Sequence, residues 1–525
     1  MALEATGPRG DDAPGSDAGR ARFWWEPEEC ETQSFTEISV NEVSWCKLCK
    51  LFVGPGIMIA IAYIDPGNYT TDLQGGSRFH YRLLWSVLFA HVLGYIFQVL
   101  VVMQSLATGR TLSEECALEY PRMRIFLWLC AEVSSVASDL GYVMGTAVAL
   151  KILFQIHLLW GVAIASCDTL LFMMLQALGH RKMEAFCALL GLIVTACCFT
   201  EIGMSGLPWE VLLGFIPAYG GLSDGAETTD STEDAQQYIW IATSIVGASV
   251  CPPNFFLHSA LVQTRQFTQG SFIESGARAM RQMSQFRTSV KFFALETAVG
   301  IFFAFCINAI ILIVAAELYY DPQHPTVIEE LADMSTMLTS VLGKGSSIVF
   351  ALSIFAGGQS ASVTGTLASQ YILEGFMKIR LKLWIRRILT RMVSIVPAFF
   401  ITLFCGDQSA TIIDDAQVVV NFAVPFTLIP ILKFVSSPVK MGPHAMSRGK
   451  TIVLWAMMCL VTLLNLATAV QLFLQNFGTT TGIILVALVM VPYFLLVGYI
   501  VLKPPSVPPG GVSDGTEKTL GQLLH

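Results

Sequence analysis

Long apolar stretches recur along this chain of 525 residues and are separated by short polar segments. A transmembrane helix needs about 20 mainly apolar residues, and twelve stretches approach or exceed that length. The pattern therefore predicts twelve membrane-spanning helices, numbered here in chain order. Their approximate bounds are 51–75, 83–107, 123–150, 157–178, 184–204, 238–264, 292–317, 346–372, 388–406, 413–436, 451–475 and 479–502.

Two of these spans are interrupted by residues that a lipid-facing helix avoids. Span 1 contains the sequence DPGN at 65–68, and span 6 contains CPPN at 251–254. Proline removes a backbone donor, and a carboxylate at the centre of the bilayer costs at least ~2.5 kcal/mol on insertion scales. Such breaks are tolerated where the freed carbonyls line a cavity or hold an ion. The two breaks therefore predict a transporter with an ion site at the membrane midplane.

The two interrupted segments also resemble each other. Both 61–69 (IAYIDPGNY) and 247–255 (GASVCPPNF) have Ala three residues before the break and Asn followed by an aromatic residue after it. Because the two spans are five apart, the two copies would have opposite orientations in the membrane, as in inverted repeats. We therefore expect repeat one at about 51–204, repeat two at about 238–436 and two extra helices at about 451–502.

The distribution of charge predicts the orientation. The even-numbered loops are rich in Lys and Arg, the long loop 205–237 is acidic, and the odd-numbered loops contain few basic residues: Arg78, Arg82, Lys151 and Lys344. The positive-inside rule then places the even loops and both termini in the cytoplasm. The polar segments 1–45 and 504–525 are predicted to be disordered cytoplasmic tails on a transporter domain at 46–503.

The composition excludes several other classes of protein. With 54% hydrophobic and only 13% charged residues, the chain is not an ordinary soluble protein. No concentrated basic surface accompanies a nucleic-acid-binding motif, and no nucleophile–base or phosphate-loop pattern indicates an enzyme. Most of the thirteen cysteines lie in apolar runs, so we expect no disulfide framework and no cofactor.

The residue types at the breaks suit a divalent cation. Asp65 offers a charged oxygen, Asn68 a neutral oxygen and Cys251 a sulfur, while unwinding would free backbone carbonyls, with those of Ala62 and Ala248 nearest. Such a mixed set fits a divalent metal better than a sugar or an amino acid. Two simpler interpretations stay open: Asp65 as a helix cap and Cys251 as a small packing residue.

Further short motifs are spread over the membrane region, and together they carry a resemblance. They lie at 54–56 (GPG), 65–68 (DPGN), 72–74 (DLQ), 138–139 (SD), 257–262 (LHSALV), 358–360 (GQS), 364–366 (TGT), 389–391 (LTR), 425–426 (PF) and 428–430 (LIP). Over about 50–500 the chain resembles the natural resistance-associated macrophage protein (NRAMP) family of divalent metal transporters. The resemblance implies an all-α, LeuT-like fold with two inverted five-helix repeats and two extra C-terminal helices. It also implies a metal held by Asp65, Asn68, the Ala248 carbonyl and the position of Cys251, joined by the Ala62 carbonyl in an occluded state.

The chain departs from this family pattern at four positions. Cys251 stands where the family usually has Met, and Pro253 stands where it has His. Tyr142 replaces a second acidic residue in span 3, and Ala423 replaces a Gln in span 10. A neutral Met thioether selects against Mg²⁺ and Ca²⁺, whereas a Cys binds soft ions as a thiolate or admits hydrated Mg²⁺ as a thiol. The sequence leaves both outcomes open.

The family's proton route is only partly present. Asp139, His258 and Arg391 remain and are expected to take part in proton movement or gating, which predicts weakened coupling. The simpler interpretations are a structural ion pair between Asp139 and Arg391, and a hydrogen bond from His258 to a neighbouring carbonyl.

The sequence thus predicts transport of divalent metals, Mn²⁺ or Fe²⁺ foremost, toward the cytosol by alternating access, with altered selectivity. Uncoupled transport of Mg²⁺ and Mn²⁺ is the alternative. The expected partners of the protein are divalent metal ions and the lipid bilayer, with protons as well if transport is coupled. A non-transporting signalling protein would need a larger C-terminal region. An organic-solute symporter would not place Asp65 where a substrate carboxylate binds.

Overall fold

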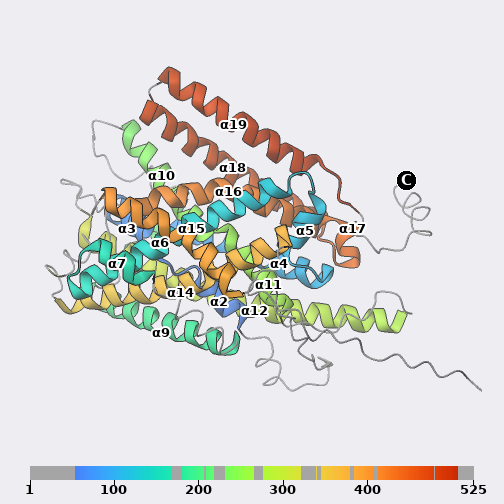
Figure 1. Cartoon of the computed structure of the whole chain (residues 1–525), viewed down its shortest axis with the longest axis horizontal. Coiled ribbons are helices and arrows are strands. Elements are labelled where there is room, and N and C mark those ends of the chain that lie inside the picture. The colour runs from blue at the N-terminus through green and yellow to red at the C-terminus, as the bar shows by residue number, and fades with distance from the viewer. Residues whose placement is uncertain are drawn as a thin grey trace, which may run out of the picture.

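The computed structural model describes most of the membrane region of the chain. The described residues are 54–166, 180–205, 208–217, 231–264, 276–320, 339, 344–378, 383–405, 412–477 and 479–506. The predicted tail 1–45 and residues 507–525 of the second tail lie outside them. Figure 1 shows that the described part is a bundle of helices.

Each of the twelve predicted spans coincides with a helix over its described part. The predicted first repeat contains α2 (Pro55–Ile61), α3 (Pro66–Phe79), α4 (Leu84–Thr108), α6 (Arg124–Phe154), α7 (Leu158–Ala165) and α9 (His180–Ser205). The predicted second repeat contains α10 (Ser231–Ser249), α11 (Pro252–Gln263), α12 (Gly276–Tyr319), α14 (Lys344–Met377), α15 (Leu383–Cys405) and α16 (Ile412–Ser436). The extra helices are α18 (Arg448–Phe477) and α19 (Thr479–Leu502). Most of the second half of span 4, residues 167–178, lies outside the described residues.

Short helices occupy some of the connections. They are η2 (His80–Leu83), α5 (Leu112–Glu119), η3 (Trp209–Phe215), α17 (Pro438–Met441) and η6 (Gly442–His444). Among the described residues, nine helical segments are long and apolar enough to cross a membrane. The division into two repeats remains a prediction, because helix bounds alone do not test it.

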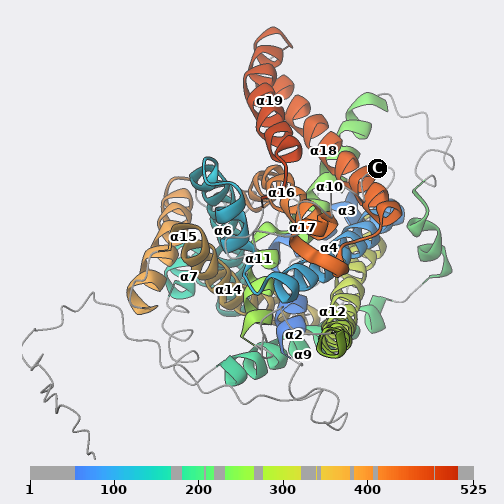
Figure 2. The ribbon, with the colours of Figure 1, turned by 90° about the vertical axis from the view of Figure 1, so that its right-hand side faces the viewer.

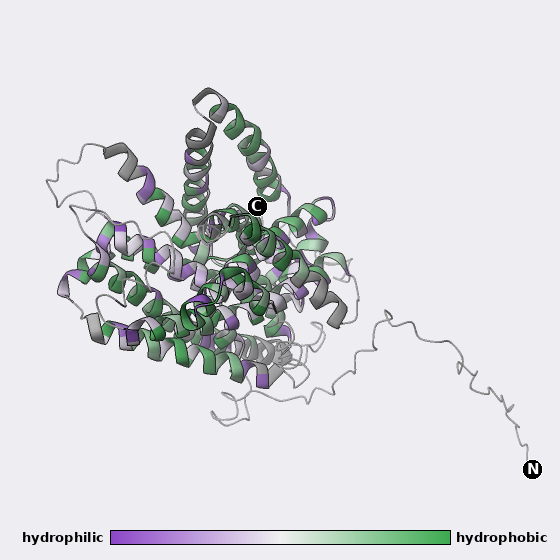
Figure 3. Ribbon diagram, turned by 60° about the vertical axis from the view of Figure 1, so that its left-hand side comes forward, coloured by the Kyte–Doolittle hydropathy of each residue, from purple (hydrophilic) through white to green (hydrophobic). Residues whose placement is uncertain are grey.

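Helices at equivalent positions of the two predicted repeats pack against each other. α6 lies against α14, α4 against α12, and α7 against α15, while the halves of the two broken helices also meet, α3 with α10 and α2 with α11. Figure 2 shows α18 and α19 standing out from this bundle as a separate pair. Figure 3 shows that hydrophobic residues predominate in the described helices, and α18 and α19 carry many exposed apolar side chains, as expected for helices in contact with lipid.

A cluster of charges joins α5 to the chain segments after α16 and α19. Lys440 Nζ lies 2.5 Å from Glu115 Oε1 and 2.7 Å from Glu119 Oε2. The backbone N–H of Ser506 donates to Glu119 at 3.1 Å, and the Ser506 hydroxyl donates to Glu119 Oε2 at 2.7 Å. Burial alone would raise the pKa of Glu119, but the hydrogen bonds from Lys440 and Ser506 outweigh it and lower the pKa. The chain that follows α19 is therefore anchored to α5.

Candidate metal site

Both predicted helix breaks are present. Residues 62–65 separate α2 from α3, and residues 250–251 separate α10 from α11. Each second half-helix begins with proline, which cannot donate to the carbonyl four residues earlier. Those two carbonyls belong to Ala62 and Ala248. The sequence thus frees the same two backbone oxygens that we expected to bind metal.

Asp65 is held at the start of α3. It has an extended backbone (φ −121°, ψ 162°), and its Oδ1 accepts a 2.7 Å hydrogen bond from the backbone N–H of Asn68. The cap interpretation is therefore confirmed, although one cap bond leaves a carboxylate with further lone pairs for a cation. The side chain is buried, with 2% of its surface exposed.

The two unwound segments face each other and are joined by two hydrogen bonds. Ser249, the last residue of α10, donates from Oγ to Asn68 Oδ1 at 3.2 Å. Asn254, in the first turn of α11, donates from Nδ2 to the Ala62 carbonyl at 3.5 Å. The breaks of spans 1 and 6 therefore meet in the middle of the bundle, as the sequence predicted.

Cys251 lies at the second break with its sulfur already engaged. The residue precedes α11 and is 2% exposed. Its Sγ lies 3.1 Å from Ser138 Oγ on α6, and it packs in an apolar cluster with Ala137, Ala416 and Val420. The packing interpretation of Cys251 therefore holds in this conformation.

Two more helices supply polar side chains to the site. The Tyr142 hydroxyl of α6 hydrogen-bonds the Asp65 carboxylate. From α16, Gln417 reaches Gly67: a Cβ on this glycine would clash with Gln417 Nε2 and would lie 3.4 Å from Asp65 Oδ1. Gln417 is 1% exposed, and its Nε2 has no hydrogen-bond partner in the described part of the chain.

The sequence pattern did not identify Gln417, because the expected site residues included only Ala423 from this span. Ala423 is a buried residue of the same helix. The only sign in the sequence was that Gln417 is an uncharged polar residue within an apolar run. Its proximity to Asp65 depends on how α16 packs, which the sequence does not reveal. Pro253 is the second residue of α11 and is likewise buried.

A second network fixes the orientation of Asn68. The Tyr63 carbonyl accepts from Asn68 Nδ2 at 2.8 Å and from Asn308 Nδ2 at 3.1 Å. Asn308 Nδ2 also lies 3.1 Å from His91 Nε2, and His91 Nδ1 lies 2.8 Å from the Val87 carbonyl. With its amide nitrogen used in this way, Asn68 directs its oxygen toward the second break. Sequence reasoning identified neither Asn308 nor His91.

Of the residues expected for proton movement, Asp139 and His258 have described side chains, and these make different contacts. Asp139 is buried on α6 beside the site, where its Oδ1 lies 2.5 Å from the position of a Cβ on Gly365. His258 points elsewhere, because its Nδ1 bonds Gln98 Oε1 on α4 at 2.8 Å. The hydrogen bond expected between His258 and a neighbouring carbonyl is thus made with the side-chain amide oxygen of Gln98. Arg391 lies in α15, but its side chain is outside the described part, so its pairing with Asp139 stays a prediction.

The donors at the breaks are chiefly oxygens. Among the described residues, no three His, Cys, Asp or Glu side chains gather where they could hold one metal ion. Around Asp65 the available groups are instead amide, hydroxyl and backbone carbonyl oxygens, with one sulfur. Such a set suits a transported ion, which must also leave, better than a permanently bound structural metal.

The helices and the paired breaks define a multi-pass membrane protein with a transporter fold. Residues 56–471 match the family model described as "Natural resistance-associated macrophage protein-like", and the chain belongs to this family. The "Natural resistance-associated macrophage protein 2 homolog" of Dictyostelium discoideum is 35% identical over 86% of this chain and 68% of its own length. "Divalent metal cation transporter MntH" of Bradyrhizobium diazoefficiens is also 35% identical, over 84% and 95% of the two chains.

A solved structure supports the same fold. The crystal structure of the Eremococcus coleocola manganese transporter in complex with an aromatic bis-isothiourea substituted compound has a TM-score of 0.75 and 25% sequence identity. The match covers 91% of this chain and 98% of that chain. The expected all-α, LeuT-like fold is thereby confirmed.

Proposed function

We propose that this protein transports divalent metal cations across a membrane, with the ion bound between the two helix breaks. The observation that carries the proposal is the meeting of the two breaks beside a buried carboxylate: Ser249 bonds the Asn68 oxygen, Asn254 bonds the Ala62 carbonyl, and Asp65 is 2% exposed. A single carboxylate among neutral oxygens attracts a divalent cation without neutralising it fully, so the ion can be released. The names of the relatives, which specify divalent metals and manganese, support this assignment.

Mn²⁺ and Fe²⁺ are the favoured cargo. Both accept mixed oxygen, nitrogen and sulfur ligands, and Asp65, Asn68 and Cys251 offer oxygen and sulfur. For the sulfur to bind, the Cys251 thiol must leave Ser138, 3.1 Å away in this structure. We therefore expect a selectivity against hard ions that is weaker than a Met at this position would give.

Mg²⁺ is the second candidate, supported by a specific observation. The sulfur of Cys251 is engaged with Ser138 and packed among apolar side chains, while Gln417 and Tyr142 add an amide and a hydroxyl near Asp65. With the sulfur engaged elsewhere, the charged and carbonyl oxygens of Asp65 and Asn68 are the main ligands, and such hard oxygen ligands suit Mg²⁺. Proton coupling would then be weak or absent, since the Tyr142 hydroxyl does not release and rebind a proton near neutral pH as readily as a carboxylic acid does.

The proposed direction of transport is toward the cytosol. The basic even-numbered loops support an orientation with both termini in the cytoplasm. Metal uptake would then run from the side of the acidic loop 205–237 toward the cytosol.

The test uses purified protein in liposomes that contain metal-sensitive and pH-sensitive dyes. Wild-type protein should take up Mn²⁺, Asp65→Ala protein should not, and both should be present at equal amounts in the membrane. Mg²⁺ uptake without internal acidification would select the second candidate. Equal uptake by wild type and Asp65→Ala would overturn the proposed site.

A further inference from the structure

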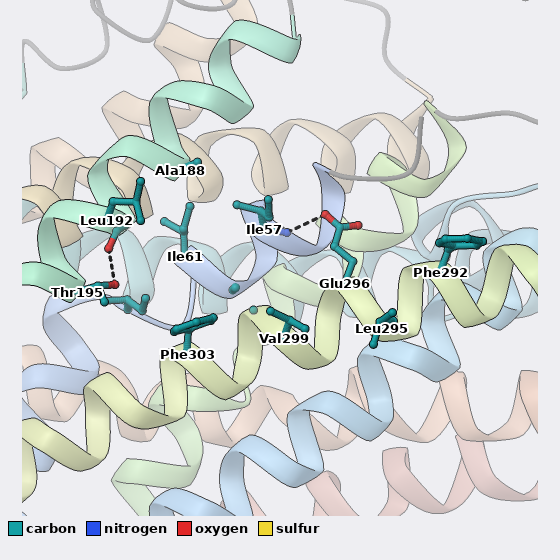
Figure 4. A pocket seen from close by; sticks show the side chains of 14 residues that line it. Ile57, Ile61, Ala188, Leu192, Thr195, Phe292, Leu295, Glu296, Val299 and Phe303 are labelled. Atoms are coloured by element: carbon teal, nitrogen blue, oxygen red, sulfur yellow. Dashed lines mark hydrogen bonds between the residues drawn. The ribbon is translucent and has the colours of Figure 1, made fainter. Parts of the chain in front are cut away.

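A groove with a volume of about 480 Å³ lies between α2, α9 and α12, on the flank of the bundle. Figure 4 shows its lining: Ile57 and Ile61 of α2 lie between Leu192 of α9 and the side chains of Val299 and Phe303 of α12. The groove therefore runs along the half-helix that leads to the first break, outside the metal site itself.

The lining of the groove is almost entirely hydrocarbon. It has two polar side chains. Thr195 Oγ1 donates to the Gly191 carbonyl at 2.7 Å, and Glu296 Oε1 accepts from the backbone N–H groups of Gly54 and Ile57 at 2.6 and 3.2 Å, while Glu296 Oε2 has no hydrogen-bond partner among the described residues. Glu296 lies beside the first turn of α2, and Phe292 extends the lining beyond it (Figure 4). The other side chains of the lining are apolar.

The walls of the groove face the membrane. Leu192 is 67% exposed, Leu295 57%, Val299 50% and Phe303 49%, and in an integral membrane protein such side chains contact lipid. The floor is different, because Ile61 and the other α2 residues are mostly buried beneath the walls. The groove is thus open sideways to the bilayer and continuous with the lipid-facing surface.

The length of the groove matches one leaflet. Along α12 it extends from Phe292 to Phe303, eleven residues or about 16 Å at the rise of an α-helix. Half of the ~30 Å hydrocarbon core of a bilayer is about 15 Å. Its inner end is Ile64, beside the break at the midplane, and its outer end is the start of α2.

We propose that this groove binds one acyl chain of a bilayer lipid and that the bound chain braces α2. Within the groove α2 already packs closely on α12, where a Cβ on Gly300 would lie 2.5 Å from Ala60 Cβ. The acyl chain adds a contact on the open, membrane-facing side of this packing. A displacement of α2, which carries Ala62 at its end, would then require the chain to rearrange.

Photo-crosslinking in lipid nanodiscs tests the binding, with a phosphatidylcholine that carries a diazirine in its acyl chain as the probe. Adducts mapped by mass spectrometry should concentrate on the groove residues of α9 and α12. Ala188→Trp, which fills the groove, should abolish those adducts. The matched control Ala487→Trp places the same side chain on the exposed face of α19 and should leave them unchanged. Adducts spread evenly over the bilayer-facing helices of the wild type would overturn the proposal, whether or not either variant folds.

Hydrogen exchange tests the bracing. In wild-type protein the amides of 57–61 should exchange more slowly in long-chain than in short-chain phosphatidylcholine, with the exposed part of α19 as the internal reference. In Ala188→Trp protein the indole replaces the chain, so exchange should no longer depend on chain length. Wild-type exchange that is independent of chain length would refute a bracing role.

Discussion

Replacing Asp65 by asparagine separates the two roles that the structure gives this side chain. Asparagine caps a helix about as well as aspartate, so Asp65→Asn should retain the 2.7 Å bond from the Asn68 amide and most of the stability. The negative charge is lost, and removing one partner of a buried charge interaction costs roughly 2–5 kcal/mol. At about 1.4 kcal/mol per tenfold, metal binding should weaken by about 30-fold to several thousandfold.

Asp65→Ala removes the cap as well as the charge. We expect the same loss of metal binding as in Asp65→Asn, together with a further loss of stability of about 1 kcal/mol. The melting temperature therefore distinguishes the two variants, whereas metal affinity does not.

The assay is isothermal titration of Mn²⁺, Cd²⁺ and Mg²⁺ into wild type, Asp65→Asn and the control Asp72→Asn. Asp72 is a buried acid on the same helix, 2% exposed and seven residues further on. Only the change at Asp65 should reduce affinity strongly. If Asp65→Asn binds within about threefold of wild type, or ~0.65 kcal/mol, the carboxylate is a cap and not a ligand.

Three further substitutions test other parts of the structure. Cys251→Met should shift uptake away from Mg²⁺ and Ca²⁺ toward Mn²⁺ and Cd²⁺ in competition experiments; unchanged preference would show that this side chain does not face the ion. Gln417→Ala should weaken metal binding about tenfold, because the loss of one hydrogen bond costs about that much, and it should not lower the melting temperature. Unchanged affinity in titration would show that Gln417 is not part of the site. Glu119→Gln should cost about 2 kcal/mol of stability near neutral pH, because charged hydrogen bonds from Lys440 and Ser506 are weakened. Folding lowers the pKa of Glu119, so the stabilisation by its carboxylate is fully present above the ordinary Glu pKa and is lost as the pH falls through the lowered pKa. The melting temperatures of variant and wild type should therefore converge in acid.

The positions of the helix breaks could be predicted from the sequence because their cause is local. A proline leaves the carbonyl four residues earlier without its helical donor in any tertiary context, and a charged residue within an apolar run is costly unless it has a functional partner. The spans were predictable for a similar reason, since bilayer thickness sets their length. The residue pattern therefore predicts where along the chain each helix lies and where it is interrupted.

The direction in which each polar side chain points could not be predicted in the same way. Gln417 and Asn308 are uncharged residues in apolar helices, and only the packing of α16 and α12 against α3 brings one to Gly67 and the other to the Tyr63 carbonyl. His258 shows the converse, because its helix passes the site while its ring turns to Gln98. Rotation about the helix axis is a tertiary property, which a single sequence does not reveal.

The hydrogen bond between the two breaks links ion binding to the arrangement of the half-helices. The Ala62 carbonyl accepts from Asn254 in this structure, so a cation that takes this oxygen as a ligand has to displace the amide. Ala62 follows directly on α2, and Asn254 lies in the first turn of α11. Exchange of one partner for the other therefore removes a direct link between α2 and α11 and replaces it with a link through the ion. On the α3–α10 side Ser249 bonds the Asn68 oxygen, which is also a proposed ligand. The two sides of the site are thus held by separate bonds, and each bond uses an oxygen that the metal is proposed to bind.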